Sequence, residues 1–141
     1  MLNRIRLASW AALLTFCAAL SAADTSARKP DFSPGQVWTF QLDRAEPPAT
    51  LTVLKVETLE KVGEVVFISV SATRMPKGIL NDLHFPMSRD ALARSVVSLV
   101  RMDEVKFDLR QYEAWKRLSG YVYTTSVSEA MAYVRETESA R

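Results

Sequence analysis

Cysteine and histidine are almost absent from this chain, which contains one of each, Cys17 and His84, among 141 residues. A single cysteine cannot form an internal disulfide, and it cannot supply the several thiolates of a structural zinc site. A single histidine leaves carboxylates as the main metal ligands, and no loop has the Asp/Asn spacing of an EF-hand. The sequence therefore predicts a domain with no metal and no cofactor, stabilised by packing.

Glycine is also scarce, with four in the whole chain. None of them falls into the spacing of a phosphate-binding loop or a dinucleotide-binding turn. The G-x-S-x-G pattern of a hydrolase nucleophile is missing as well. These absences exclude the common nucleotide-binding motifs and leave any catalytic serine unmarked.

The first 23 residues have the three-part pattern of a secretory signal peptide. Arg4 and Arg6 provide a basic start, and residues 7–20 are apolar apart from one serine and one threonine. Small residues at 21–23 then precede the polar Asp24. This order of basic, apolar and small residues predicts cleavage after residue 23 and export to the periplasm or beyond.

Two other interpretations of this segment fit the residues less well. An uncleaved anchor helix needs about 20 apolar residues to cross a bilayer, which is longer than the stretch at 7–20. A lipoprotein signal has a small residue before its lipidated cysteine, whereas Phe16 precedes Cys17. We therefore expect the processed chain to have no membrane span and no cysteine.

The processed chain is predicted to be electrically balanced. The whole sequence has 18 Lys+Arg and 16 Asp+Glu, and without Arg4 and Arg6 there are 16 of each. No basic run remains that would attract nucleic acid or an anionic membrane surface. We therefore expect no nucleic-acid partner.

The predicted domain limits are a signal peptide at 1–23, a flexible leader at 24–34, one domain at 35–136 and a frayed tail at 137–141. Residues 36–42, 50–59 and 64–74 have the alternation of strands, joined by short connections. Three such strands in succession predict an antiparallel meander, and residues 83–85 form a candidate extra strand.

Helical spacing replaces the alternation after Ser88. One helix is expected from Ser88 through Val100, a second after Asp108 up to Gly120, and a third after Ser126. Residues 121–125 alternate like a short late strand. The predicted fold class is α+β: a curled antiparallel meander sheet followed by about three helices and one short late strand, with the helices packed on one face.

The stretch PGQVWTF at 34–40 resembles the opening of a family of small uncharacterised bacterial proteins. The resemblance continues through 65–70, through 83–88 and to Tyr112 and Trp115. The shared residues are apolar and turn residues, which report a shared fold better than a shared chemistry. The resemblance supports the domain limits and implies no activity for any position.

His84 and Asp82 are the candidate catalytic residues. They are two positions apart, so on a strand their side chains would share a face, and Ser69 or Ser88 would have to supply a nucleophile. A carboxylate pair for glycoside chemistry is a second route. The sequence pairs Glu57 with Glu60 and Asp103 with Glu104 are interpreted as solvated surface charges.

The candidate binding residues lie in two segments. The connection at 75–87 is long and apolar for a compact domain, and long ordered loops are often functional. The alternation after Gly120 places two tyrosines on one face, which suits a protein interface. These candidates are Ile79, Leu83, Phe85, Tyr121 and Tyr123.

Two functions therefore remain open. The first is an exported binding, inhibitory or accessory protein whose partner is another envelope protein. The second is a small envelope hydrolase that uses His84 or a carboxylate pair.

The export hypothesis predicts the mass of the protein purified from cells. We expect a chain that begins at Asp24, because cleavage should follow the small residues at 21–23. Intact mass spectrometry of the protein from a periplasmic extract checks this. A chain that still begins at Met1, or one found in the cytosol, would contradict it.

Overall fold

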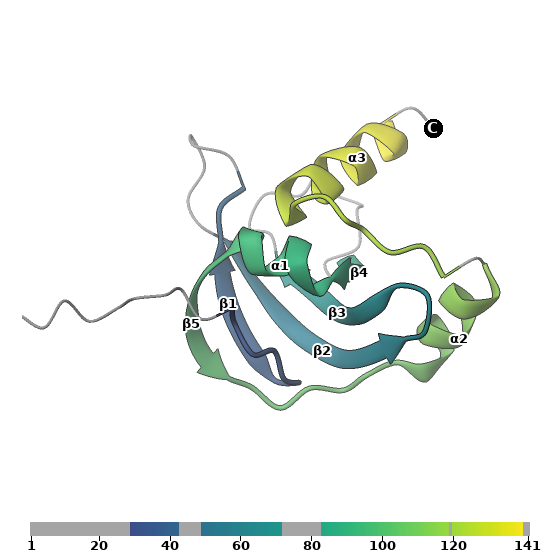
Figure 1. The fold of residues 1–141 in the computed structure, drawn as a ribbon. Helices are drawn as coiled ribbons and strands as arrows, with labels where there is room; N and C mark the ends of the chain where they lie inside the picture. Colours follow the sequence, from purple (N-terminus) through teal and green to yellow (C-terminus); the bar gives the residue numbers. More distant parts are fainter. Residues whose placement is uncertain (1–28, 43–48, 72–82, 119, 140–141) are drawn as a thin grey trace, which may run out of the picture.

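The computed structural model describes residues 29–42, 49–71, 83–118 and 120–139. Five strands form one antiparallel sheet in the order β4-β3-β2-β1-β5 (Figure 1). The strands are β1 (Gln36–Phe40), β2 (Ala49–Leu59), β3 (Gly63–Ser71), β4 (Leu83–Ser88) and β5 (Val96–Met102). The helices are α1 (Arg89–Ser95), α2 (Leu109–Arg117) and α3 (Val127–Ser139). The α+β class is confirmed.

The meander is confirmed for four strands. Each strand from β1 to β4 pairs antiparallel with the next one along the chain. The pairing of β2 with β3 shifts register between Val53 and Lys55. Alternation alone places Leu54 on the face opposite to Leu51 and Val53, and the shift returns Val56 to the core that contains Val53.

Helices cover both faces of the sheet, so the expectation of helices on one face is wrong. The larger core joins the sheet to α1 through Leu92 and to α3 through Met131. The smaller core lies on the other face, where Phe67 of β3 and Tyr112 of α2 belong to one buried cluster. Figure 1 shows α1 and α3 together over one face and α2 at the far end of β2 and β3.

The helix expected from Ser88 through Val100 is half wrong. Ser88 does cap α1, where its hydroxyl accepts a hydrogen bond from the backbone N–H of Ala91 at 3.3 Å. The helix ends at Ser95, and residues 96–102 form β5 instead, paired with β1. Apolar residues at helical spacing mislead here, because β-branched valines also suit a strand.

The other two helices begin as expected. Asp108 caps α2, and its carboxylate accepts from the backbone N–H of Arg110 at 2.9 Å. At α3, Ser126 and Glu129 form the reciprocal capping box, with the backbone N–H of each donating to the other's side chain. The short late strand is reduced to one parallel bridge between Tyr123 and Met87.

The described part of the leader packs on the domain. Phe32 is buried and meets Trp38 edge to face, with 5.7 Å between ring centroids. The guanidinium of Arg89 donates to the carbonyl of Pro30 at 2.9 Å and to Glu64 at 2.6 Å. Within the four ranges given above, no helix has the length and apolar character that crossing a membrane requires.

Gly35 connects β5 to the meander. Its N–H donates to the carbonyl of Val53 at 2.9 Å, and its carbonyl accepts from the N–H of Asp103 at 2.8 Å. Its φ of +94° favours glycine, and a Cβ built there would lie 2.6 Å from the Asp103 carbonyl oxygen. The turn therefore has no room for a side chain.

We predict that Gly35→Ala destabilises the protein more than Gly63→Ala does. Gly63 also has a positive φ, +83°, but a Cβ there would meet nothing within 4 Å. The control thus carries the backbone strain alone, and the extra cost at Gly35 should be about 1–3 kcal/mol, as for other overpacked sites. Urea unfolding of both variants measures the difference, and equal losses would contradict the close approach at Asp103.

Candidate functional site

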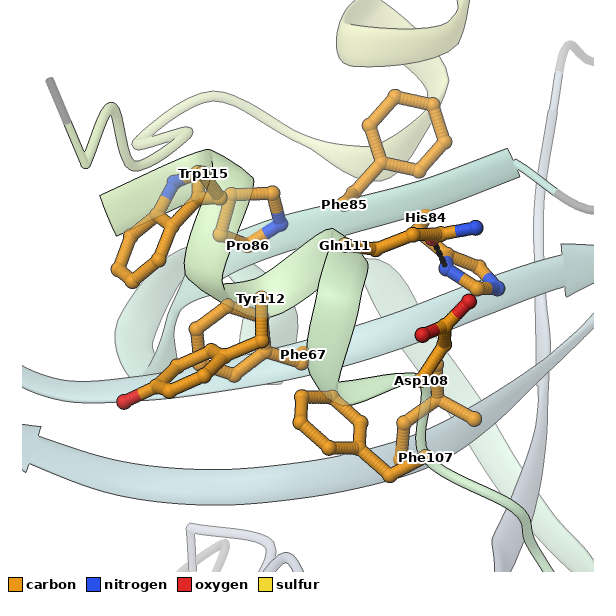
Figure 2. Close-up of a pocket in the computed structure, with 10 residues that line it drawn as sticks. Phe67, His84, Phe85, Pro86, Phe107, Asp108, Gln111, Tyr112 and Trp115 are labelled. Carbon is orange, nitrogen blue, oxygen red and sulfur yellow. Dashed lines mark hydrogen bonds between the residues drawn. The ribbon is translucent and has the colours of Figure 1, made fainter. Parts of the chain in front are cut away.

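A pocket of about 170 Å³ lies between α2 and the sheet, over β3 and β4 (Figure 2). Most of its wall is aromatic or aliphatic, and three polar side chains stand at one end. The residues that line it are Leu54, Phe67, His84, Phe85, Pro86, Phe107, Asp108, Gln111, Tyr112 and Trp115. Concave apolar sites with a few polar groups are the usual form of a binding pocket.

Phe67 organises the apolar wall. Its ring meets three others edge to face, at centroid distances of 5.9 Å to Phe107, 5.5 Å to Tyr112 and 4.9 Å to Trp115. Tyr112 and Trp115 stack on each other at 5.8 Å. Each such pair contributes about 0.5–1.5 kcal/mol beyond its buried area. The wall is therefore held in place by its own ring contacts.

The sequence of α2 explains why one helix supplies most of the site. Asp108, Gln111, Tyr112 and Trp115 are spaced at i, i+3, i+4 and i+7, which places them on one side of a helix. The Asp108 cap fixes where the first turn begins. Tyr112 is buried against the sheet, and the polar Asp108 and Gln111 are left at the edge of the same side.

The polar end joins α2 to β4. His84 Nδ1 forms a hydrogen bond with Gln111 Oε1, and with the amide oriented in this way Nδ1 is the donor. Figure 2 shows the Asp108 carboxylate pointing toward the same imidazole. Backbone and side-chain hydrogen bonds from Arg110 lower the pKa of Asp108, so this group is a carboxylate at neutral pH. The end of the pocket beside His84 therefore carries a negative charge.

A second polar contact holds Tyr112 from the opposite side. The Tyr112 hydroxyl donates to Glu57, whose carboxylate also lies 3.1 Å from the Lys55 ammonium. The same ammonium sits 3.8 Å from the centroid of the Tyr112 ring. The hydrogen bond from Tyr112, followed by that from Lys55, lowers the pKa of Glu57. Glu57 is partly exposed, and besides being a surface charge it links α2 to β2 through Tyr112.

The structure places the predicted catalytic candidates as follows. His84 lines the pocket. The acid that points toward its ring in Figure 2 is Asp108, which comes from another part of the chain. Asp82 lies outside the described residues. Ser69 is the register partner of His84 across β3 and β4, whereas the Ser88 hydroxyl caps α1.

The predicted binding candidates have different surroundings in the structure. Ile79 lies outside the described residues, and Leu83 packs against the larger core. Phe85 is buried in that core and also lines the pocket. Tyr121 and Tyr123 meet edge to face at 5.0 Å, in a second hollow that they share with Tyr133 of α3.

The tyrosine hollow is larger than the pocket, with a volume of about 430 Å³. Tyr121 and Tyr133 are both more than half exposed, while burial raises the pKa of Tyr123. The two regions are linked, because the indole N–H of Trp115 donates to the carbonyl of Tyr121 at 2.8 Å. Tyr121 is exposed, whereas Tyr123 is partly buried, so the two tyrosines are not an exposed pair. The aromatic pocket beside them was not predicted.

The signal for the missed pocket was present in the α2 spacing. Phe67 and Phe107 could not be assigned to it, since nothing local in the sequence brings β3 and the segment before α2 together. No cluster of three or more His, Cys, Asp or Glu suited to a metal occurs among the described residues. The two acids at 103 and 104 do not form a site, because Asp103 binds Arg101 through both carboxylate oxygens, at 2.9 and 3.0 Å.

Comparisons with protein-family models, with curated proteins and with solved structures find no match to this chain. The case for a function therefore depends on the residues and geometry of the site.

The Tyr112–Glu57 hydrogen bond predicts a pH-dependent loss of stability in Tyr112→Phe. The pKa of Glu57 in the folded state lies below its ordinary value of 4.5. Such a group contributes stability that is fully present above the unfolded pKa and is lost as the pH falls through the folded pKa. At neutral pH the variant should lose about 1.5 kcal/mol, the lower end of the range for a hydrogen bond to a charged group, because Glu57 is partly exposed.

The difference between wild type and Tyr112→Phe should shrink as the pH drops below 4.5. Urea unfolding at a series of pH values gives both free energies of unfolding. Tyr121→Phe is the matched control, because this exposed hydroxyl has no carboxylate partner among the interactions described. A difference between wild type and Tyr112→Phe that is independent of pH would contradict the assignment.

Proposed function

We propose that the processed chain is an exported binding module of the bacterial envelope, which holds one apolar side chain of a partner protein in the aromatic pocket. The observation that carries this proposal is the combination of a ring-lined cavity with a charged acceptor at one end. The signal-peptide pattern supports a site of action in the periplasm or outside the cell.

The size of the pocket limits what it accepts. Its volume is about 170 Å³. A protein cavity of about 150 Å³ takes up benzene, whereas drug-sized ligands and cofactors occupy about 300–1,000 Å³. One aromatic ring or one branched aliphatic side chain therefore fits, and a nucleotide or a larger cofactor does not.

The polar end limits the chemistry further. The Asp108 carboxylate accepts hydrogen bonds, and charge-assisted hydrogen bonds are the stronger ones. The best occupant is a ring that carries a donor at its far end, such as the phenol of a tyrosine side chain. Tyrosine is also one of the residues that dominate the binding energy of protein interfaces.

A hydrolase is the second candidate, favoured by the position of His84 between Ser69 and Asp108. Ser69 is the cross-strand partner of His84, and the Asp108 carboxylate points toward the imidazole. Against this role, Nδ1 of His84 is bonded to Gln111, and Ser69 does not line the pocket. Hydrolysis of an aryl ester that Ser69→Ala abolishes would favour this second function over the first.

Fluorescence of Trp115 tests the binding function. In the processed chain the two tryptophans are Trp38 and Trp115, so a Trp38→Phe background leaves the pocket residue as the sole reporter. We expect N-acetyl-tyrosinamide to change this emission in a saturable way. N-acetyl-alaninamide, which has no ring to fill the pocket, should leave it unchanged.

The affinity should fall in Asp108→Asn by roughly fivefold, since a charged acceptor becomes a neutral one. Asparagine caps helices as well as aspartate does, so α2 is retained. Asp103→Asn removes a carboxylate outside the pocket and is the matched control. An emission that no ring compound changes, or equal affinities in the two variants, would contradict the proposal.

A further inference from the structure

The two edge strands of the sheet, β4 and β5, differ in whether further backbone groups pair with them. The edge at β4 is partly covered by the segment that follows α2. There the N–H of Tyr123 donates to the carbonyl of Pro86 at 2.8 Å, and the N–H of Ser88 donates to the carbonyl of Tyr123 at 2.9 Å. At the other edge, β5 pairs with β1 on its inner side, and no described strand or bridge pairs with its outer side.

The residues of β5 are unusual for an exposed edge. Four apolar side chains are largely open to solvent: Val97 (69%), Leu99 (48%), Val100 (49%) and Met102 (60%). Exposed edge strands are normally protected by lysines, prolines, inward charges, bulges or short length, and of these β5 has two register shifts against β1. The only charged residue in β5 is Arg101, and Asp103 already pairs with it at 2.9 Å.

Pairing with β1 does not explain these apolar residues. The register between β1 and β5 shifts twice and leaves Val97 and Val100 without a partner on β1. Both side chains add apolar surface that the fold does not bury. An apolar edge of seven residues that contains no lysine and no proline is therefore a surface suited to pairing with another strand.

We infer that β5 pairs antiparallel with β5 of a second copy of this chain, about a twofold axis near Leu99. This arrangement sets Leu99 opposite Leu99, Val96 opposite Met102, and Arg101 opposite Val97. No like charges face each other, and the strand is complementary to itself, as a twofold interface requires. Removal of residues 1–23 leaves 16 basic and 16 acidic residues, so two copies have no net charge by which to repel one another.

The inferred interface is separate from the pocket. The pocket is built over β3 and β4, whereas β5 lies at the opposite edge of the sheet. Dimerisation through β5 extends the sheet across two molecules and leaves each pocket open. The inference stands independently of what the pocket binds.

A charge-swap experiment tests both the interface and its register. Leu99→Lys and Leu99→Glu each place like charges directly opposite one another across the axis, which destabilises a strand pair. We expect sedimentation of the processed wild-type chain to give twice the monomer mass, and each variant alone to give the monomer mass. An equimolar mixture of the two variants should return the doubled mass, because lysine then faces glutamate.

Val62→Lys is the matched control, since Val62 is 47% exposed in the turn between β2 and β3 and should leave the dimer intact. Circular dichroism establishes that each variant is folded. A monomeric wild type, a dimer that persists in both Leu99 variants, or a mixture that stays monomeric would each overturn the inference. A β5 that proves to bind an extended segment of a different protein in place of its own copy would overturn it too.

Discussion

The burial of β3 on both faces is the constraint on which the rest of the structure depends. Val66, Ile68 and Val70 face the larger core, while Val65 and Phe67 face the smaller one. A strand with apolar side chains on both sides needs other elements packed on both sides. Each such side chain that stays exposed forgoes about 1.5–3 kcal/mol of stabilisation from burial. The helices are therefore divided, with α1 and α3 on one face and α2 on the other.

The pocket is a product of this division. A nine-residue helix such as α2 is too short to cover its face of the sheet completely. Its aromatic side chains surround Phe67, and the space left between the rings and β4 is the cavity. The Asp108 cap that begins the helix lies at the edge of that space. The same group thus fixes the helix and gives the cavity its charge.

The sequence predicts those features that depend on neighbouring residues. Alternation identifies β1 to β3, and the reciprocal pattern of Ser126 and Glu129 identifies the start of α3, because both signals act within a few residues. The failures involve distant partners. Residues 96–102 have an apolar spacing that suits a helix, and pairing with β1 makes them a strand. The spacing of apolar residues along one segment does not show which distant segment it will pair with.

The candidate site shows the same limit. His84 stands out as the sole histidine, but its neighbours Asp108 and Gln111 are more than twenty positions away. The expected neighbour, Asp82, was chosen because it was close in sequence. The aromatic wall combines Phe67 with residues of the α2 region, and only the docking of α2 on β3 brings them together. The local sequence determines the helix and the strands that contribute to the pocket, and their tertiary packing brings the pocket residues together.

The bridge at Tyr123 has a consequence for how far the sheet can grow. It closes part of the β4 edge, so that in the portion of the chain described here β5 is the edge left open. A molecule with two open edges can add further molecules at each end and extend into a fibre. With the β4 edge covered in part, a single pairing at β5 uses up the edge that is more open. Two backbone hydrogen bonds from the connection between α2 and α3 thus hinder the addition of a further strand at the β4 edge.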